Sequence, residues 1–267
     1  MIEFRDVDYR LNGNNAPSSS AAKSGNSRTH NADGKVILDR LNLQIASGET
    51  FVLLGRSGSG KTTALRLVNR LLEPTSGAVL VSQRATTDWD PVALRRGIGY
   101  VIQDAGLFPH YTVEQNIAVA PRLENWPEDR IYARIEELLN LVGLQSAEFA
   151  ARYPRELSGG QRQRVGVARA LAADPKILLM DEPFGALDPI TRAEIQKEFL
   201  ALQKRLRKTV VFVTHDTREA LYLGNRIGLM EGGRLVNVFT PEQFLHETSG
   251  AAAKYLAALQ IGEPGSA

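Results

Sequence analysis

The sequence predicts an α/β fold with a mostly parallel sheet, an antiparallel β part at the N-terminus and a helical subdomain inserted between strands. Three observations support this prediction. From residue 177 onward, short apolar runs alternate with helical patterns, an order that places parallel strands between helices. Residues 2–11 alternate apolar and polar side chains, as a half-buried strand does. The segment from about 104 to 173 is rich in helical patterns and poor in β-branched runs.

The first part of the chain contains four predicted strands and one predicted helix. The strands are expected at 2–11, 36–45, 50–54 and 78–81. A helix is expected at 61–72, because its leucines and Val68 recur at three- and four-residue spacings. Residues 12–34 hold no large apolar side chain to bury against a core, so we expect a mobile surface loop inserted in a hairpin.

The rest of the chain continues the pattern to the end of a single domain, 1–267. In the middle segment, Pro127 sits in the first turn of a helix whose apolar stripe begins at Ile131, and Gly143 can end it. The C-terminal part then predicts a strand, a helix, a second strand, a second helix, a hairpin around Glu231-Gly232-Gly233 and a helical tail, at 177–180, 190–206, 210–213, 217–224, 227–239 and 241–267.

Composition excludes several classes of protein. The net charge is +2, from 32 basic and 30 acidic residues, which is not the excess of basic residues typical of nucleic-acid-binding proteins. The absence of cysteine rules out disulfides and thiolate metal sites. The sequence has no apolar stretch approaching the roughly 18 residues that a membrane helix needs, and its first residues form no apolar signal core. Any membrane association is therefore expected through a partner chain.

A glycine-rich segment directly follows the strand predicted at 50–54. It reads Gly55-Arg56-Ser57-Gly58-Ser59-Gly60-Lys61-Thr62-Thr63 and fits the pattern G-x-x-x-x-G-K-[ST]. Glycines let backbone N–H groups face phosphates, the next helix directs its positive end at the same anion, and the lysine reaches the terminal phosphates. The threonine after the lysine joins the Mg²⁺ shell. A plain glycine-rich turn is the alternative, with a prior of roughly one in twenty in this setting.

Two acidic residues end the strand predicted at 177–180. A carboxylate at the carboxyl end of a parallel strand faces the ligand crevice, so Asp181 would hold Mg²⁺, through water. Glu182 would orient or deprotonate the attacking water. A solvated strand end is the ordinary alternative; four preceding apolar residues and Pro183 favour the site.

Residues 157–161, Leu157-Ser158-Gly159-Gly160-Gln161, precede a helical run and are called the signature segment below. Ser158 can cap that helix, and the two glycines expose backbone donors. Together with the loop at 55–62 and Asp181-Glu182, this segment makes the chain resemble the ATP-binding subunit of an ABC transporter, over nearly its whole length except 12–34. The resemblance implies a P-loop NTPase (ABC ATPase) core that uses ATP and Mg²⁺.

The resemblance also implies roles for other residues. The signature segment would close over the γ-phosphate held by a second copy, giving a head-to-tail dimer around two ATP, and Asp188 would cross that interface. Gln103 would contact Mg²⁺ and the attacking water and relay to the membrane partner. His215 would hydrogen-bond the γ-phosphate. Without the other motifs, Gln103 would be a polar strand end and His215 a packing residue, as we expect for His30, His110 and His246.

The adenine contact stays open between two alternatives. The family usually stacks adenine on an aromatic residue near the end of the first strand, where this sequence has Leu11. Tyr9 lies two residues earlier, on the same strand face if the alternation holds. Either Tyr9 takes that role, or adenine meets an aliphatic wall and binds more weakly.

Residues 69–75, 98–110 and 181–191 resemble the ATPases of importers for glycine betaine, choline and similar osmoprotectants. This implies permease subunits, an indirect link to a solute-binding protein, and a place at the cytoplasmic face of the membrane. Many such ATPases carry CBS modules; this sequence ends at Ala267, so we expect no gating by them. Alternatives are importers of amino acids or other polar solutes, lipid-transport ATPases, and ABC ATPases of DNA repair or translation, which usually have two cassettes or a long coiled coil. The signature segment argues against a small-molecule kinase.

Overall fold

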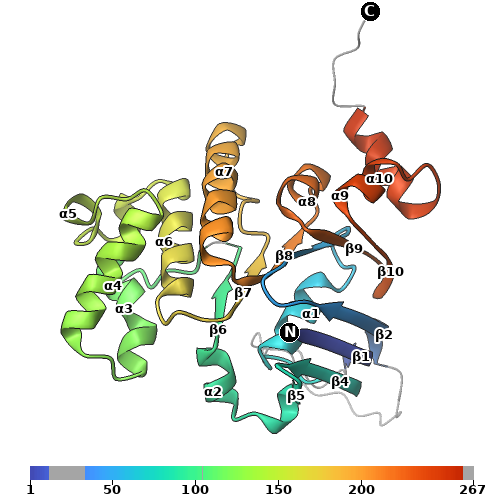
Figure 1. Cartoon of the computed structure of the whole chain (residues 1–267), viewed down its shortest axis with the longest axis horizontal. Coiled ribbons are helices and arrows are strands. Elements are labelled where there is room, and N and C mark those ends of the chain that lie inside the picture. Colours follow the sequence, from blue (N-terminus) through green and yellow to red (C-terminus); the bar gives the residue numbers. More distant parts are fainter. Residues whose placement is uncertain (12–33, 104, 261–267) are drawn as a thin grey trace, which may run out of the picture.

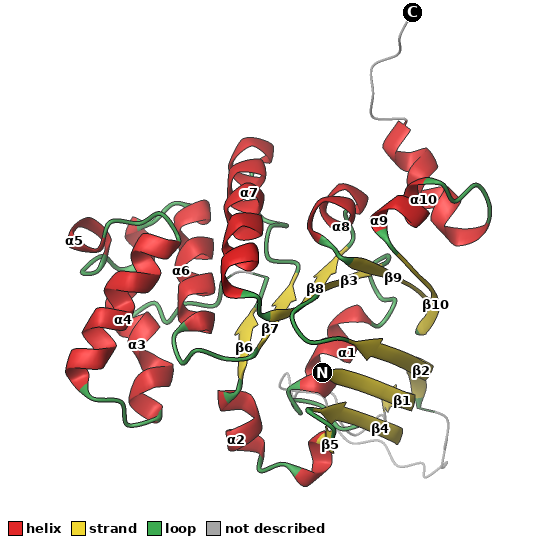
Figure 2. Cartoon of the chain, viewed as in Figure 1, coloured by secondary structure: helices red, strands yellow, loops and turns green. Residues whose placement is uncertain are grey.

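The computed structural model describes residues 1–11, 34–103 and 105–260, which form two sheets with helices packed around them (Figures 1 and 2). Apart from Gly34, the loop expected at 12–34 lies outside the described residues, as does the end of the expected helical tail. Within the described ranges, no helix has both the length and the apolar character needed to cross a membrane.

The larger sheet has six strands in the order β10-β9-β3-β8-β7-β6. All neighbours pair in parallel except β9 and β10, which form the expected antiparallel hairpin, so the prediction of a mostly parallel sheet is confirmed. Its strands are β3 (Thr50–Leu54), β6 (Ile98–Val101), β7 (Ile177–Asp181), β8 (Thr209–Thr214), β9 (Arg226–Glu231) and β10 (Arg234–Phe239).

Strands β3, β7 and β8 of this sheet are buried along their whole length, which explains why they read as continuous apolar runs rather than as alternating ones. Side chains alternate between two cores: Val52 and Leu54 of β3 join the core beneath helices α3 to α10, and Phe51 and Leu53 join the core shared with the second sheet. Because β3, β8, β7 and β6 are parallel neighbours, the segments that follow them emerge at one edge of the sheet.

The second sheet is antiparallel, as predicted for the N-terminal part, with the order β2-β1-β4-β5. Its strands are β1 (Ile2–Leu11), β2 (Lys35–Ile45), β4 (Ser76–Val81) and β5 (Arg84–Ala85). The register between β1 and β2 shifts where Asp6 and Arg40 both adopt φ of 46°. Side chains stabilise this irregularity: Asn42 donates to Asp6 over 2.7 Å, and the Arg40 N–H donates to Asp8 over 2.7 Å.

Helix α1 (Lys61–Val68) lies between the two sheets and buries Ala64, Leu65, Leu67 and Val68. The predicted helix, 61–72, was therefore too long by one turn. Arg70 takes a left-handed φ of 54°, and the N–H groups of Leu71 and Leu72 both fold back to the carbonyl of Arg66. Leu71, expected in the buried stripe, is half exposed. The apolar stripe predicted for the helix was misleading, because Leu72 reaches the core through the chain reversal at Arg70 and not through continued helix.

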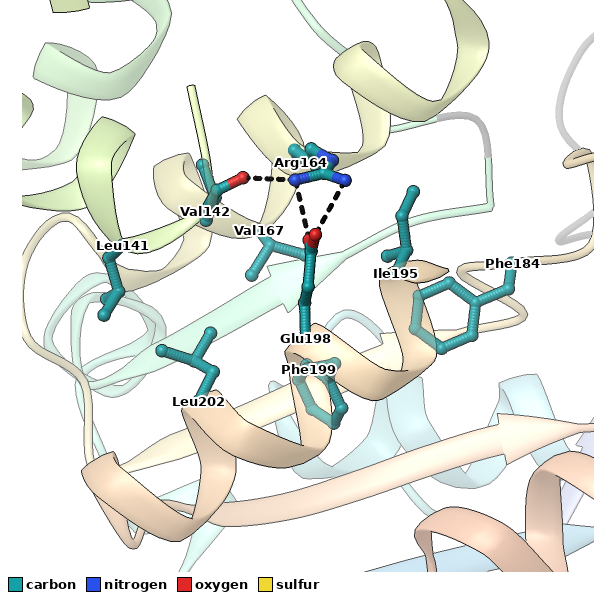
Figure 3. Close-up of a pocket in the computed structure, with 9 residues that line it drawn as sticks. All are labelled: Leu141, Val142, Arg164, Val167, Phe184, Ile195, Glu198, Phe199 and Leu202. Atoms are coloured by element: carbon teal, nitrogen blue, oxygen red, sulfur yellow. Dashed lines mark hydrogen bonds and ion pairs between the residues drawn. The ribbon is translucent and has the colours of Figure 1, made fainter. Parts of the chain in front are cut away.

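Between β6 and β7, the described residues form only helical elements and loops, and these lie beyond the β6 edge, at the opposite end of the molecule from β10 (Figure 2). The helices are α3 (Val113–Leu123), α4 (Glu128–Leu141), α5 (Ser146–Phe149) and α6 (Gly159–Leu171), with short 3-10 turn η2 (Pro154–Glu156) before α6. Arg164 of α6 ties them to α7: it donates to the Val142 carbonyl over 2.8 Å and to Glu198 over 3.0 Å, above an apolar crevice (Figure 3).

The remaining helices are α2 (Pro91–Arg96), α7 (Pro189–Leu206), α8 (Thr217–Leu223), α9 (Pro241–Leu245) and α10 (Gly250–Gln260), with the short 3-10 turn η1 (Thr86–Asp88) before α2. The sequence analysis missed α2, although Asp90 caps it and Pro91 occupies its first turn, a recognisable start signal. It also read α9 and α10 as one tail.

Gly99 on β6 is packed too closely for any side chain. A Cβ there would lie 2.3 Å from the backbone carbonyl oxygen of Ala170 in α6. We expect Gly99→Ala to lower the free energy of unfolding by about 1–3 kcal/mol, the usual cost of overpacking a core. Gly97→Ala is the matched control, because its nearest neighbour would be 3.5 Å away. Denaturant unfolding of both variants tests this, and equal midpoints would contradict it.

Candidate active site

The glycine-rich loop leaves the buried strand β3 and enters α1, as its sequence predicted. Gly58 and Gly60 have φ of 80° and 98°, which other residues rarely adopt. A Cβ on Gly60 would lie 2.9 Å from the Ile37 carbonyl oxygen, and one on Gly55 would lie 2.5 Å from the Met230 carbonyl oxygen. These glycines are therefore required by backbone conformation and by the close approach of β2 and β9.

Lys61 is only 4% exposed, and its ammonium group lies inside the loop. It donates to the carbonyls of Gly55 and Arg56 over 2.8 and 3.0 Å. Burial lowers the pKa of Lys61, and the carboxylates of Glu182 and Asp181 partly oppose this. Ser59 Oγ is buried and has no hydrogen-bond partner among the described residues. The loop thus holds a buried cation and an unsatisfied hydroxyl.

The side chain of Asp181, at the end of β7, meets the loop. Thr62 Oγ1 donates to Asp181 Oδ1 over 2.8 Å, and the Tyr100 hydroxyl on β6 lies 3.4 Å from Oδ2. Burial raises the pKa of Asp181, Glu182 adds to that rise, and the bond from Thr62 opposes it. The sequence analysis missed Tyr100, because only the pairing of β6 with β7 brings it to Asp181.

Glu182 and His215 face each other across the ends of β7 and β8. His215 Nδ1 lies 3.0 Å from Glu182 Oε2. The backbone at Glu182 is left-handed, with φ of 45°, and its N–H donates to the Val213 carbonyl over 3.0 Å. A Cβ on Gly185 would lie 3.9 Å from both Gln103 Nε2 and Glu182 Oε2, so both side chains border Gly185.

A cleft of about 710 Å³ opens in front of these groups, within the size range of ligand sites. It brings together six predicted residues: Arg56, Ser57, Thr62, Gln103, Glu182 and His215. Residues that the sequence analysis missed complete the lining, namely Thr217, Glu231 and the α10 residues Ala251, Lys254, Tyr255 and Ala258. No local pattern marks them, because α10 reaches the cleft only through the fold.

The signature segment lies elsewhere. Ser158 caps α6 in a reciprocal pair with Gln161, over 3.2 and 2.9 Å. A Cβ on Gly160 would lie 2.6 Å from Thr191 Cγ2, so that glycine lets α6 approach α7. Asp188 caps α7 by accepting from the Thr191 N–H over 3.1 Å. None of these residues lines the cleft described above.

Tyr9 is also separate from the cleft. It pairs with Leu38 across β1 and β2 and packs against the core shared by the two sheets. Its contact with adenine stays a prediction.

Glu219 is a buried carboxyl near His215, and burial raises its pKa above the ordinary 4.5. Asp216 adds to that rise; hydrogen bonds from Thr214 and Gln196 and the charge of Arg192 oppose it. The native state therefore binds more protons at this group than the unfolded state, so its contribution is fully present below pH 4.5 and is lost as the pH rises through the native pKa.

Removing that titration should change the pH dependence of stability. We expect Glu219→Gln to gain stability relative to the wild type as the pH increases from 4.5, because the amide never has to ionise in a buried place. Urea unfolding of both proteins between pH 4.5 and 8 measures the difference. A difference that stays constant across this range would contradict the assignment.

The fold and the loop define a protein of the P-loop NTPase class: a mostly parallel sheet carries the loop between β3 and α1 at the edge where Asp181, Glu182 and His215 also lie. Within that class the sequence matches the ABC transporter family over residues 38–185. More than half of the chain is matched, and the chain belongs to this family.

Three similar proteins can be named. An osmoprotectant import ATP-binding protein of Salmonella typhimurium is 54% identical over 208 residues, covering 78% of this chain and 54% of the relative. A choline transport ATP-binding protein of Bacillus subtilis is 54% identical over 212 residues, covering 79% and 55%. The chain spans about half the length of these curated relatives. An ATP-binding cassette solved as a dimer in a post-hydrolysis state, bound to ADP and Pi, superposes with a TM-score of 0.74 at 33% identity, covering 90% of this chain and 99% of the other.

Proposed function

We propose that this chain is the ATP-hydrolysing subunit of an ABC importer, and that two copies enclose two ATP molecules to drive a conformational change in permease subunits. One observation carries the proposal: the loop, Glu182 and His215 share a cleft that the same copy's signature segment does not line. In this arrangement the site of one copy would be incomplete, and a head-to-tail second copy would complete it. The similar cassette solved as a dimer supports this arrangement.

The loop would bind the triphosphate. Its backbone from Gly55 to Gly60, with Arg56, Ser57, Gly58 and Ser59, would surround the phosphates, and Thr62 and Thr63 open the helix behind them. Lys61 would exchange its two carbonyl partners for phosphate oxygens, which are stronger acceptors because they are charged. The unpartnered Ser59 hydroxyl fits this reading, since a phosphate would satisfy it.

The residues at the end of β7 fit a Mg²⁺ ion. The Thr62 hydroxyl and the Asp181 carboxylate are oxygen ligands 2.8 Å apart, and Thr62 and Gln103 both line the cleft. When bound, Mg²⁺ would neutralise charge on the phosphate oxygens.

Glu182 is placed to act as the base. It would take a proton from a water whose oxygen bonds to the terminal phosphorus while the bond to the ADP oxygen breaks. His215, 3.0 Å from Glu182, would hydrogen-bond the terminal phosphate. From a second copy, Ser158, Gly159, Gly160 and Gln161 would approach that phosphate, and Asp188 would cross the interface.

A groove of about 490 Å³ between α2, α3 and β6 is the proposed contact with the permease. Phe108 and Leu123, 41% and 60% exposed, give it apolar character, and Arg95, Arg96 and Arg169 add positive charge. Gly106 and Phe108 of this groove follow Gln103 closely in the chain, so a shift at the nucleotide would reach a membrane partner there through this segment. Through permease subunits the chain would lie at the cytoplasmic face of the membrane and serve a solute-binding protein indirectly. Nucleic acid is not a proposed partner.

The proposed solutes are osmoprotectants of the glycine betaine and choline type, on the support of the relatives' names.

Two experiments test the function. The purified chain should hydrolyse ATP with Mg²⁺ and lose this activity in EDTA. Affinity purification from solubilised source membranes should recover two permease subunits, and recovery of ribosomes or DNA instead would refute transport. Radiolabelled choline and glycine betaine uptake in cells lacking the chain tests the solute.

A further inference from the structure

Thr214, the residue before His215, is held by a carboxyl group that the proposed mechanism does not use. Thr214 is 2% exposed, and its hydroxyl donates to Glu219 Oε2 over 2.5 Å. The same hydroxyl accepts from the Asp216 N–H over 2.9 Å. The Thr214 side chain therefore links the backbone of Asp216, on the C-terminal side of His215, to Glu219. Glu219 is on α8 and 4% exposed.

Helix α7 also contacts the segment around His215. Gln196 donates to Glu219 Oε1 over 3.0 Å, so both oxygens of the buried carboxyl have a partner. The Arg192 guanidinium lies 3.5 Å from Asp216 Oδ2 and also donates to the Leu187 carbonyl over 3.0 Å. Both neighbours of His215 in the chain are thus fixed to α7 or α8.

The His215 side chain itself has little support. It is 60% exposed, and among the residues that the structure describes its one polar contact is with Glu182. Its position must therefore be set through its backbone. Burying a carboxyl costs free energy that an apolar residue of similar size would not cost, so packing alone does not account for Glu219. A buried hydrogen-bond network in which both oxygens of the carboxyl have a partner instead fixes geometry.

We propose that Glu219 is a positioning residue for hydrolysis, which acts through Thr214 to hold the His215 backbone so that its ring meets Glu182 and the terminal phosphate. This inference rests on the proposed function. It predicts that breaking the network slows the chemical step and leaves nucleotide binding intact, because the loop of residues 55–62 is not part of it. A displacement of about 1 Å at a reacting group can cost on the order of 100-fold in rate.

The test compares matched substitutions. Thr214→Val keeps the shape and removes the hydroxyl, and Glu219→Leu removes both acceptors; we expect each to lower kcat by roughly 10- to 100-fold with the KM for MgATP within about threefold. Thr214→Ser and Glu219→Gln, which keep the hydroxyl and a carbonyl acceptor, should regain most of the rate. Arg218→Ala, exposed on the same helix and outside the cleft, is the control.

The outcomes separate the two claims. If the wild type does not hydrolyse MgATP, the proposed function falls and this inference falls with it. If the wild type is active and Thr214→Val keeps its kcat, or raises KM alone, only the inference is overturned. Melting temperature and ATP affinity are measured for every variant; should Glu219→Leu fail to fold, the pair Thr214→Val and Thr214→Ser decides. A rate that Thr214→Ser does not recover also overturns it.

Discussion

Replacement of Glu182 by glutamine should lower kcat for ATP hydrolysis by at least about 100-fold, the usual contribution of a positioned general base. Glutamine has nearly the same shape and can accept the contact with His215, but it cannot take a proton from water. The affinity for ATP should stay within a few-fold of the wild type, because Lys61 and the loop are untouched. Single-turnover hydrolysis and a fluorescent-nucleotide titration measure the two quantities.

Glu231→Gln is the control for this variant. Glu231 is a second carboxylate that lines the same cleft, from the end of β9, so the substitution makes the same change in charge in the same cleft. Its kcat should remain close to that of the wild type. If the two variants lose activity equally, the effect belongs to the charge of the cleft and not to proton transfer at Glu182.

Two inactive variants should regain activity when they are mixed. Lys61→Ala removes the phosphate-binding cation, and Ser158→Glu places a negative charge where the partner's terminal phosphate is expected; each alone should be nearly inactive. In a mixed dimer one site combines the intact Lys61 of one copy with the intact Ser158 of the other. An equimolar mixture should therefore recover up to about a quarter of wild-type activity, since half of the dimers are mixed and each has one intact site.

The control mixture combines Lys61→Ala with Glu182→Gln. Both changes affect the same half of the composite site, so every site in every dimer remains defective, and no activity should return. Activity measured against mixing ratio distinguishes the cases. Recovery in both mixtures, or in neither, would contradict a site shared between two copies.

Much of the fold follows from local patterns. Strands β3, β7 and β8 were predictable because their apolar runs are buried on both faces, and the glycine-rich loop because backbone geometry allows few alternatives to Gly60. Strand β6 was not among the predicted strands. The end of α1 was not predictable, because Arg70 reverses the chain in a left-handed conformation that arginine seldom adopts. Helix α2 carried a cap and a proline that were overlooked.

The residues of the site also fall into two groups, those that local sequence predicts and those that it does not. Residues that directly follow predicted strands could be placed together in advance, because neighbouring parallel strands end at one edge. Contacts between residues far apart in the sequence could not be predicted. Tyr100 meets Asp181 through strand pairing, and Tyr255 reaches the cleft from helix α10. The role assigned to Ser158 is tested by the mixing experiment above, and the roles of Asp188 and Tyr9 stay predictions.

The hydrogen bonds of Lys61 within its own loop have a kinetic consequence. A long, flexible side chain normally loses freedom when it captures an anion, and that loss slows or weakens capture. Here the ammonium group is already fixed by two carbonyls. Encounter should then be limited by diffusion, and stopped-flow rates should rise linearly with nucleotide concentration and show no plateau.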